Sequence, residues 1–135
     1  MYLLDTNVVS ELRKNKPHGA VLAWIKSVPD ASLYLPSVTI GEIQAGIELT
    51  REQDPEKAAE LDRWLDQVAA SYNVLPLDGP AFRCRARLIH TACDTPYEDA
   101  MIAAIARVHQ LTVVTRNTAD FASLGVTLLN PFKYA

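Results

Sequence analysis

The chain opens with Met1-Tyr-Leu-Leu-Asp5-Thr6-Asn7, a short apolar run that ends abruptly in an acid and two small polar residues. We interpret Tyr2 to Leu4 as a buried strand with Asp5 at its carboxyl end. Open α/β sheets bind ligands at the edge where their strands end. Asp5 also stands where the N-cap of the following helix is expected, with Thr6 or Asn7 as alternative caps. From Asp5 alone, a ligand-binding role and a capping role are equally well supported. The other acids of the chain decide between these two roles.

The composition excludes several classes of protein. The chain has 135 residues, of which 49% are hydrophobic, and a formal net charge of −3. We expect one domain spanning residues 1–135. Because nucleic acids are bound by clustered Lys and Arg, any contact with them has to be local. Cys84 and Cys93 lack metal-binding spacing, and we find no signal-peptide pattern and no apolar run long enough for a membrane span. We therefore expect reduced thiols in a cytoplasmic protein.

Strand and helix patterns alternate along the whole chain. After the first strand, helical spacing continues to about Arg13, and further strands are predicted near residues 32–35, 73–77, 111–115 and 126–129. Asp54-Pro55 and Asp78-Gly79-Pro80 are typical of helix caps followed by proline. Alternating strands and helices indicate a parallel sheet covered on both faces. We therefore expect a three-layer α/β/α sandwich with a short, mostly parallel sheet of about four or five strands.

Two acids open predicted helices. Glu42 lies in the first turn of a helix that follows a strand, but it is also the last residue of a possible capping box, Thr39 to Glu42. A second capping box, Thr95 to Glu98, accounts for Glu98 and leaves Asp99 without a structural role. Asp99 stands at the head of an apolar helix face, which points it toward the sheet. A lone buried carboxylate is costly unless it is paired or bound to a metal.

Asp120 comes a few residues after the last long strand, and its alternative role is that of a solvated loop acid. Asp5, Glu42, Asp99 and Asp120 each lie at or just after the start of a helical segment that follows a strand or loop. The carboxyl ends of parallel strands meet at one edge, so we expect these carboxylates to converge. Clustered carboxylates repel one another, and a set of oxygen ligands suits Mg²⁺ or Mn²⁺. Such an ion can polarise a phosphate and activate a water molecule.

Four segments carry a resemblance to a known family. They are Leu-Leu-Asp5-Thr6-Asn7, Glu42 in its helix, Glu98-Asp99-Ala-Met-Ile102-Ala103-Ala104 and Val-Val-Thr115-Arg116-Asn117-Thr-Ala-Asp120-Phe121. In this order, and over essentially the full length, they resemble the PIN domain, and within it the VapC group of toxins with its FitB-like members. The combined pattern is specific, whereas any single segment is not.

The resemblance implies an endoribonuclease that depends on Mg²⁺ or Mn²⁺ and hydrolyses RNA with a metal-activated water, as the toxin of a type II toxin–antitoxin pair. It also implies a homodimer, often assembled into a heterooctamer with a VapB- or FitA-like antitoxin, and contact with operator DNA only through that antitoxin. The acid quartet of the family maps onto Asp5, Glu42, Asp99 and Asp120. Asn117 is the alternative to Asp120 as the fourth group. Of these, Asp5 and Asp99 match the principal metal ligands. The supporting polar positions are Thr6, Asn7, Thr115 and Asn117.

Local cations have to guide an RNA substrate on this acidic chain. The candidates closest in sequence to the acids and to the first helix are Arg13, Lys14, Lys16 and Arg116. Arg83, Arg85 and Arg87 alternate with a period of two on a predicted helix, so they cannot all face one way. For at least two of these three arginines we expect a solvated position.

Other functions remain compatible with the same residues. A metal-dependent DNA nuclease would use the same four acids. A non-catalytic component of a DNA-binding repressor complex, formed with the antitoxin, would need none of them. In a third alternative, the acids of an α/β domain serve only as helix caps. Four converging carboxylates favour catalysis, because a scaffold has no need for them. No Ser or Cys is paired with a His, so we expect no covalent intermediate.

Overall fold

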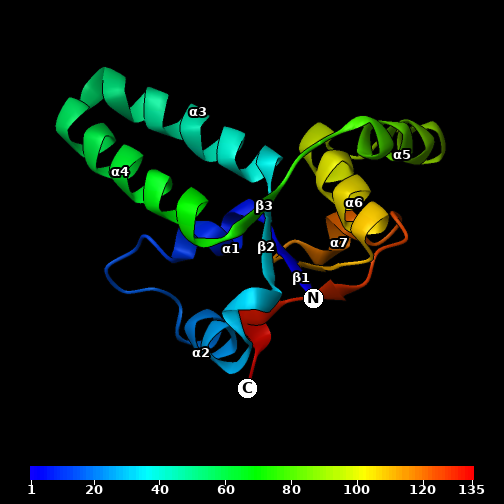
Figure 1. The fold of residues 1–135 in the computed structure, drawn as a ribbon, viewed down its shortest axis with the longest axis horizontal. Helices are drawn as coiled ribbons and strands as arrows, with labels where there is room; N and C mark the ends of the chain where they lie inside the picture. Colours follow the sequence, from blue (N-terminus) through cyan, green and yellow to red (C-terminus); the bar gives the residue numbers. More distant parts are fainter.

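The centre of the computed structural model, which describes residues 1–135, is a five-stranded sheet in which every neighbouring pair is parallel (Figure 1). Its strands are β1 (Tyr2–Leu4), β2 (Leu33–Pro36), β3 (Asn73–Leu75), β4 (Thr112–Val114) and β5 (Leu128–Leu129). They lie in the order β3-β2-β1-β4-β5, which places the first strand of the chain in the middle. The predicted parallel sheet is therefore confirmed, although β3, β4 and β5 are shorter than the sequence indicated.

Helices make all the connections between the strands. They are α1 (Thr6–Glu11), α2 (Gly19–Ser27), α3 (Ser37–Gln53), α4 (Pro55–Ser71), α5 (Gly79–Thr91), α6 (Tyr97–His109) and α7 (Thr118–Phe121), with 3₁₀ turns at Asp30–Ser32 and Pro131–Lys133. The side chains of Asp54 and Asp78 cap α4 and α5, and each helix has proline in its first turn, as predicted. None of these helices is both long and apolar enough to cross a membrane.

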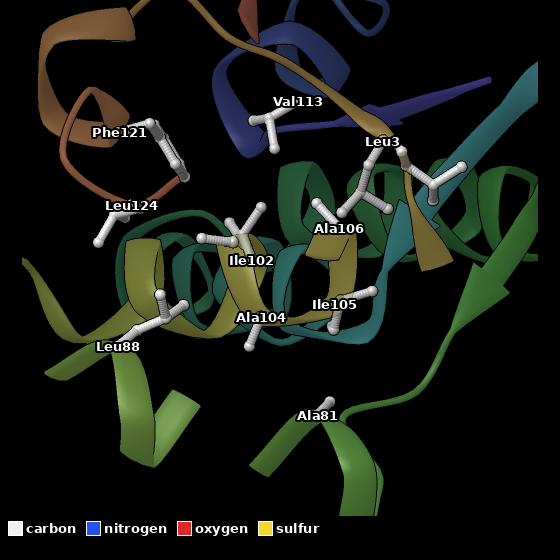
Figure 2. Packing of buried hydrophobic residues seen from close by; sticks show 12 residues of the cluster. Leu3, Ala81, Leu88, Ile102, Ala104, Ile105, Ala106, Val113, Phe121 and Leu124 are labelled. Carbon is white, nitrogen blue, oxygen red and sulfur yellow. The ribbon is translucent and has the colours of Figure 1, made fainter. Parts of the chain in front are cut away.

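Side chains of β1 alternate between two cores, one on each face of the sheet. Leu3 is fully buried in a cluster with Val113 and residues of α5, α6 and α7. Leu4 is fully buried in a second cluster, with Val114 and residues of α1, α2 and α4. Figure 2 shows α6 between the strands and α5. The helices therefore cover both faces, and the predicted three-layer sandwich is confirmed.

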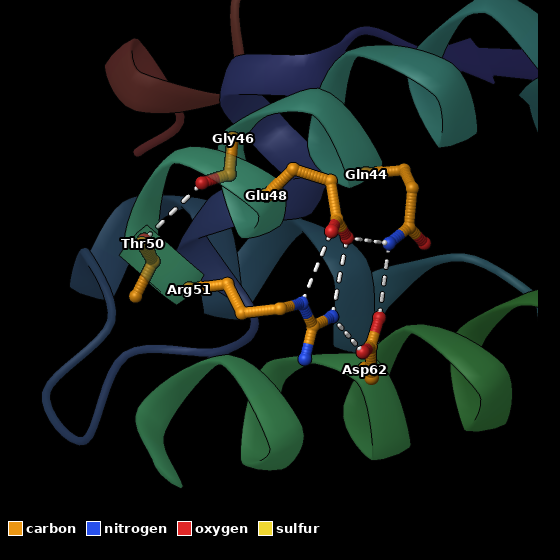
Figure 3. Close-up of polar contacts among 6 residues, drawn as sticks. All are labelled: Gln44, Gly46, Glu48, Thr50, Arg51 and Asp62. Atoms are coloured by element: carbon orange, nitrogen blue, oxygen red, sulfur yellow. Dashed lines mark hydrogen bonds and ion pairs between the residues drawn. The ribbon is translucent and has the colours of Figure 1, made fainter. Parts of the chain in front are cut away.

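The α3–α4 hairpin projects from one side of the sheet, opposite α5 and α6 (Figure 1). Its helices enclose a small separate cluster made of Ile47, Ala58 and Leu65. Polar groups also join the helices, because the Arg51 guanidinium pairs with both Glu48 and Asp62 (Figure 3). The Gln44 amide donates to Glu48 Oε2 at 2.8 Å and to Asp62 Oδ1 at 3.0 Å. These groups are half-buried or exposed, so the network sets how the helices are aligned and adds little stability.

Phe121 tests the larger core, because it is fully buried and belongs to α7, the element that also carries Asp120. We expect Phe121→Ala to lower the free energy of unfolding by about 3–5 kcal/mol, the usual cost of removing a buried ring. The matched control is Phe82→Ala on α5, where the ring is 50% exposed. Its cost should stay below about 1 kcal/mol. Urea unfolding followed by circular dichroism measures both variants, and equal losses would contradict the assigned core.

Candidate functional site

Asp5 lies at the carboxyl end of β1, where the strand order changes direction between β1 and β4. It is 5% exposed, and both of its carboxylate oxygens accept hydrogen bonds. Oδ1 accepts the Thr6 backbone N–H at 2.8 Å. Oδ2 accepts the Thr115 hydroxyl at 2.7 Å and the Asn7 amide at 3.2 Å. Asp5 is also the N-cap residue of α1, so the capping interpretation is confirmed, and its position at the sheet edge stays compatible with the predicted ligand-binding role.

Asn7 and Thr115 connect α1 to the end of β4. The Thr115 hydroxyl, which is fully buried, accepts the Asn117 backbone N–H at 3.0 Å and the Asn7 amide at 3.3 Å. Asn7 Oδ1 accepts the Arg116 backbone N–H at 3.1 Å. The polar residues predicted to support Asp5 are therefore next to it, except that Asn117 takes part through its backbone.

Glu42 faces α1 and does not cap its own helix. Thr39 lies inside α3, whose cap position makes no side-chain hydrogen bond, so the alternative interpretation of Glu42 as part of a capping box is wrong. The Thr6 hydroxyl donates to Glu42 Oε1 at 3.0 Å and lies 3.1 Å from the Thr39 hydroxyl. Burial raises the pKa of Glu42, the bond from Thr6 opposes this, and the charge of Asp5 adds to it. Contact between α1 and α3 thus brings Glu42 close to Asp5.

Asp99 lies in the first turn of α6, within the field of the other acids. Burial is the largest cause that raises its pKa to about 6, and four carboxylates raise it further: Asp5, Asp120, Glu42 and Glu98. Pro96 occupies the cap position of α6, and no side chain caps this helix. The predicted Thr95–Glu98 capping box is therefore wrong. Glu98 is a fifth acid near the cluster, and the sequence did not indicate it because its position fitted a cap.

Asp120 is exposed on α7, beside a hollow of about 420 Å³ that it forms with residues 91–96 and Ser123. Its charge raises the pKa of both Asp5 and Asp99, although burial is the larger cause at each. Asn117, the alternative fourth group, is the N-cap residue of α7 without a side-chain bond. Asp120 therefore belongs electrostatically to the cluster, and Asn117 contributes a backbone donor.

The donor chemistry fits a hard divalent cation, but the carboxylates do not form a ready-made cage. Every candidate ligand is a carboxylate oxygen, the ligand type that Mg²⁺ and Mn²⁺ prefer. No group of three or more His, Cys, Asp or Glu side chains is close enough to enclose an ion. Mg²⁺ usually keeps several waters and is held by one or two carboxylates. Hydrogen bonds orient the Asp5 carboxylate, and the charges of four other acids act on Asp99.

Of the four predicted substrate-binding cations, Arg13 shares a hollow with Glu42, and Arg116 follows the Thr115 that bonds Asp5. Arg116 follows Thr115 directly, and its guanidinium stacks over the Phe132 ring with Cζ 4.3 Å from the centroid. Arg13 lines a hollow of about 210 Å³ together with Thr6 and Glu42. Phe132 could not be identified from the sequence, because the contact joins the C-terminal 3₁₀ turn to the end of β4.

The other two predicted cations lie in the loop after α1, and the structure does not bring them to the acids. Lys14 pairs with Glu11, a buried acid that also accepts the His18 backbone N–H at 2.9 Å. Lys16 is exposed and makes no ion pair. Neither lysine lines the hollow that holds Glu42.

Comparisons of the sequence with known proteins identify the family. The pattern of the PIN domain matches residues 2–126. The VapC ribonuclease Y4jK of Sinorhizobium fredii is 36% identical to this chain, and the alignment covers 100% of both. Toxin FitB of Neisseria gonorrhoeae is 34% identical, with 98% of this chain and 99% of FitB covered.

Solved structures agree with the sequence relatives. The crystal structure of FitAcB from Neisseria gonorrhoeae is similar with a TM-score of 0.88 and 33% identity, covering 98% of this chain and 99% of that one. The structure of FitAB bound to an IR36 DNA fragment gives a TM-score of 0.89 and 31% identity, covering 100% and 98%. Because the family pattern and these relatives match nearly the whole chain, the protein belongs to the PIN domain family, in its group of VapC and FitB toxins.

Proposed function

We propose that this chain is a divalent-metal-dependent endoribonuclease and the toxin component of a type II toxin–antitoxin module. The observation that carries the proposal is the Asp5 carboxylate, which is buried at the carboxyl end of β1 and accepts three hydrogen bonds. Glu42 is joined to this site through the Thr6 hydroxyl, and the charges of Asp5, Asp120 and Glu42 all act on Asp99. A helix-capping role explains only Asp5 among the four predicted acids. The names of the relatives, VapC ribonuclease Y4jK and Toxin FitB, agree with this activity.

Each polar residue of the site has a distinct task in the proposed reaction. Asp5 and Asp99 would hold the cation, and Thr115, Asn7 and the Thr6 N–H keep the Asp5 carboxylate in one orientation. When bound there, a divalent ion polarises the scissile phosphate and lowers the pKa of an attacking water. Glu42 and Asp120 would orient that water or help to hold a second cation. Hydrolysis by water leaves a 5′-phosphate and a 3′-hydroxyl.

Two further groups would serve the substrate and not the cation. Arg116 is held over Phe132 at the end of β4, and Arg13 shares a hollow with Thr6 and Glu42. Both guanidiniums can offset the charge of RNA phosphates next to a cluster of acids. Without such cations, the acids would repel the substrate they are proposed to cleave.

We also propose a second role, in a repressor complex with the antitoxin. The structure of FitAB bound to an IR36 DNA fragment matches this chain over its full length. A net charge of −3 makes direct DNA binding by this chain unfavourable, so contact with operator DNA would go through a VapB- or FitA-like antitoxin. The chain would act there as a homodimer, in a heterooctamer with the antitoxin.

Ribonuclease activity should be lost in Asp99→Asn. We expect Mg²⁺- or Mn²⁺-dependent cleavage of total RNA by the wild type, abolished by EDTA, and a rate at least about 100-fold lower in the variant. Asp66→Asn, an exposed acid of α4 that touches nothing in the site, is the control and should cleave normally. Parallel digestion of single-stranded DNA tests the DNA-nuclease alternative. Equal RNA cleavage by Asp99→Asn and wild type would refute the assigned site.

Thr115 is proposed to orient Asp5, so its loss should weaken metal use more than it weakens the fold. We expect Thr115→Val to raise the Mn²⁺ concentration for half-maximal cleavage about 10-fold, since partners of metal ligands typically contribute this much. Thr112→Val is the control. Thr112 lies three residues earlier, on β4, and the substitution also removes a threonine hydroxyl, but one that does not bond Asp5. An unchanged Mn²⁺ dependence in Thr115→Val would show that the hydrogen bond does not matter for metal use.

The raised pKa of Asp99 predicts how stability depends on pH without metal. The pKa is 3.8 ordinarily and about 6 in the folded chain, so the folded state binds more protons between these values. Stability therefore falls as pH rises through this window. In EDTA, Asp99→Asn should be more stable than wild type at pH 7, and its advantage should shrink as the pH is lowered to 4. Urea unfolding at four pH values measures this, and a pH-independent difference would contradict it.

A further inference from the structure

A hollow of about 550 Å³ between α5 and α6 is lined by three arginines and few other groups. Arg83 and Arg87 come from α5, and Arg107 comes from the last turn of α6. The rest of the lining is Gly79, Pro80, Cys84 and Val108. Because Asp99 opens α6 and Arg107 lies near its end, the hollow begins about 12 Å along this helix from the acid cluster.

The three guanidiniums have no counter-ion. None of them takes part in an ion pair. Residues 79–93 and 100–119 contain no Asp or Glu, so neither α5 nor the body of α6 can supply one. Asp78, which precedes α5, is engaged in capping and accepts the Ala81 N–H at 3.2 Å. Three like charges around one hollow repel each other, and a bound anion relieves that repulsion.

Neighbouring structure sets how these arginines point. Arg83 and Arg87 are four residues apart on a helix and therefore share a face, whereas Arg85 turns away and stacks on Tyr97 with Cζ 4.1 Å from the ring centroid. Arg107 lines this hollow and also a second one, and its guanidinium lies beside Gly125 of the second, where a Cβ would come within 3.3 Å of Nη1. The predicted solvated position is confirmed for Arg83 and Arg87, which are exposed. The sequence did not show that these two arginines line one hollow with a third from α6.

We propose that Arg83, Arg87 and Arg107 form a second RNA-contacting site, which binds backbone phosphates of single-stranded RNA whose scissile phosphate lies at the acids. Arginine is suited to this because its planar fork pairs with phosphate oxygens in a bidentate manner. The lining holds three guanidiniums and no aromatic ring on which a base could stack, so we assign phosphate and not base recognition. The inference rests on the proposed ribonuclease function for the identity of the ligand, while the charge cluster stands independently of it.

Salt-dependent RNA binding tests the site without cleavage. In EDTA, we would measure the Kd of a fluorescent single-stranded RNA by anisotropy between 50 and 300 mM KCl, for wild type, Arg83→Gln, Arg87→Gln and Arg107→Gln. Each lost phosphate contact should lower the slope of log K against log salt by about 0.7, which corresponds to about fivefold weaker binding at 0.1 M salt. Arg63→Gln, an exposed and unpaired arginine of α4, changes the net charge equally and should leave the slope unchanged.

Protection of the Cys84 thiol from labelling by a maleimide tests the site without changing any charged residue. Cys84 lines the hollow and is half-buried, and Cys93 is exposed, so Cys93→Ser leaves one thiol to label. Saturating RNA should slow maleimide labelling of Cys84 several-fold, whereas a mononucleotide or inorganic phosphate at the same phosphate concentration should protect less. Protection by free phosphate alone, or by poly-aspartate and not RNA, would overturn the proposal in favour of a small anion or an acidic partner.

The outcomes also separate this proposal from the nuclease itself. Slopes in all three variants equal to that of Arg63→Gln, or no RNA binding by the wild type, would overturn the second site. The nuclease proposal is tested separately, by RNA cleavage with the Asp99→Asn variant. Metal-dependent cleavage with unchanged salt slopes in the arginine variants would therefore refute only the arginine site. The predicted decrease in these slopes, without metal-dependent cleavage by the wild type, would refute only the nuclease.

Discussion

The burial of one carboxylate at the centre of the sheet is the constraint on which the site depends. Asp5 ends the middle strand and is almost inaccessible, and burial raises its pKa despite three hydrogen bonds that act in the opposite direction. These bonds come from both sides of the strand-order reversal, from α1 and from the end of β4. A carboxylate in this position is costly by itself, and the surrounding donors are what allow it to be tolerated.

The fold was largely predictable from the sequence because its signals are local. Apolar runs for the strands and the caps Asp54 and Asp78 depend on neighbours within a few residues, and the structure has them. Glu42 and Glu98 show where local signals mislead. Both fitted capping boxes, yet Glu42 bonds Thr6 across 36 residues and no side chain caps the helix of Glu98. A capping pattern describes what a side chain can do locally, and a contact between α1 and α3 overrides it.

Contacts between distant elements were the part that the sequence could not provide. Arg116 stacks on Phe132, and Arg107 joins Arg83 and Arg87, only because the fold brings their elements together. Along α6 itself, Glu98 and Asp99 lie in the first turn and Arg107 lies in the last. One helix therefore carries negative charge at the end near the acid cluster and positive charge at the end near the arginine-lined hollow.

The hydrogen bond from Thr115 to Asp5 joins residues that are 110 positions apart. Closing a loop of this length costs conformational entropy, which the pairing of β4 with β1 has to offset. The Thr115 hydroxyl reaches Asp5 only when β4 lies beside β1, so this support for the carboxylate needs the chain to extend at least through residue 115. A nascent chain that ends before β4 has Asp5 and Glu42 but lacks the hydroxyl that holds Asp5 in place.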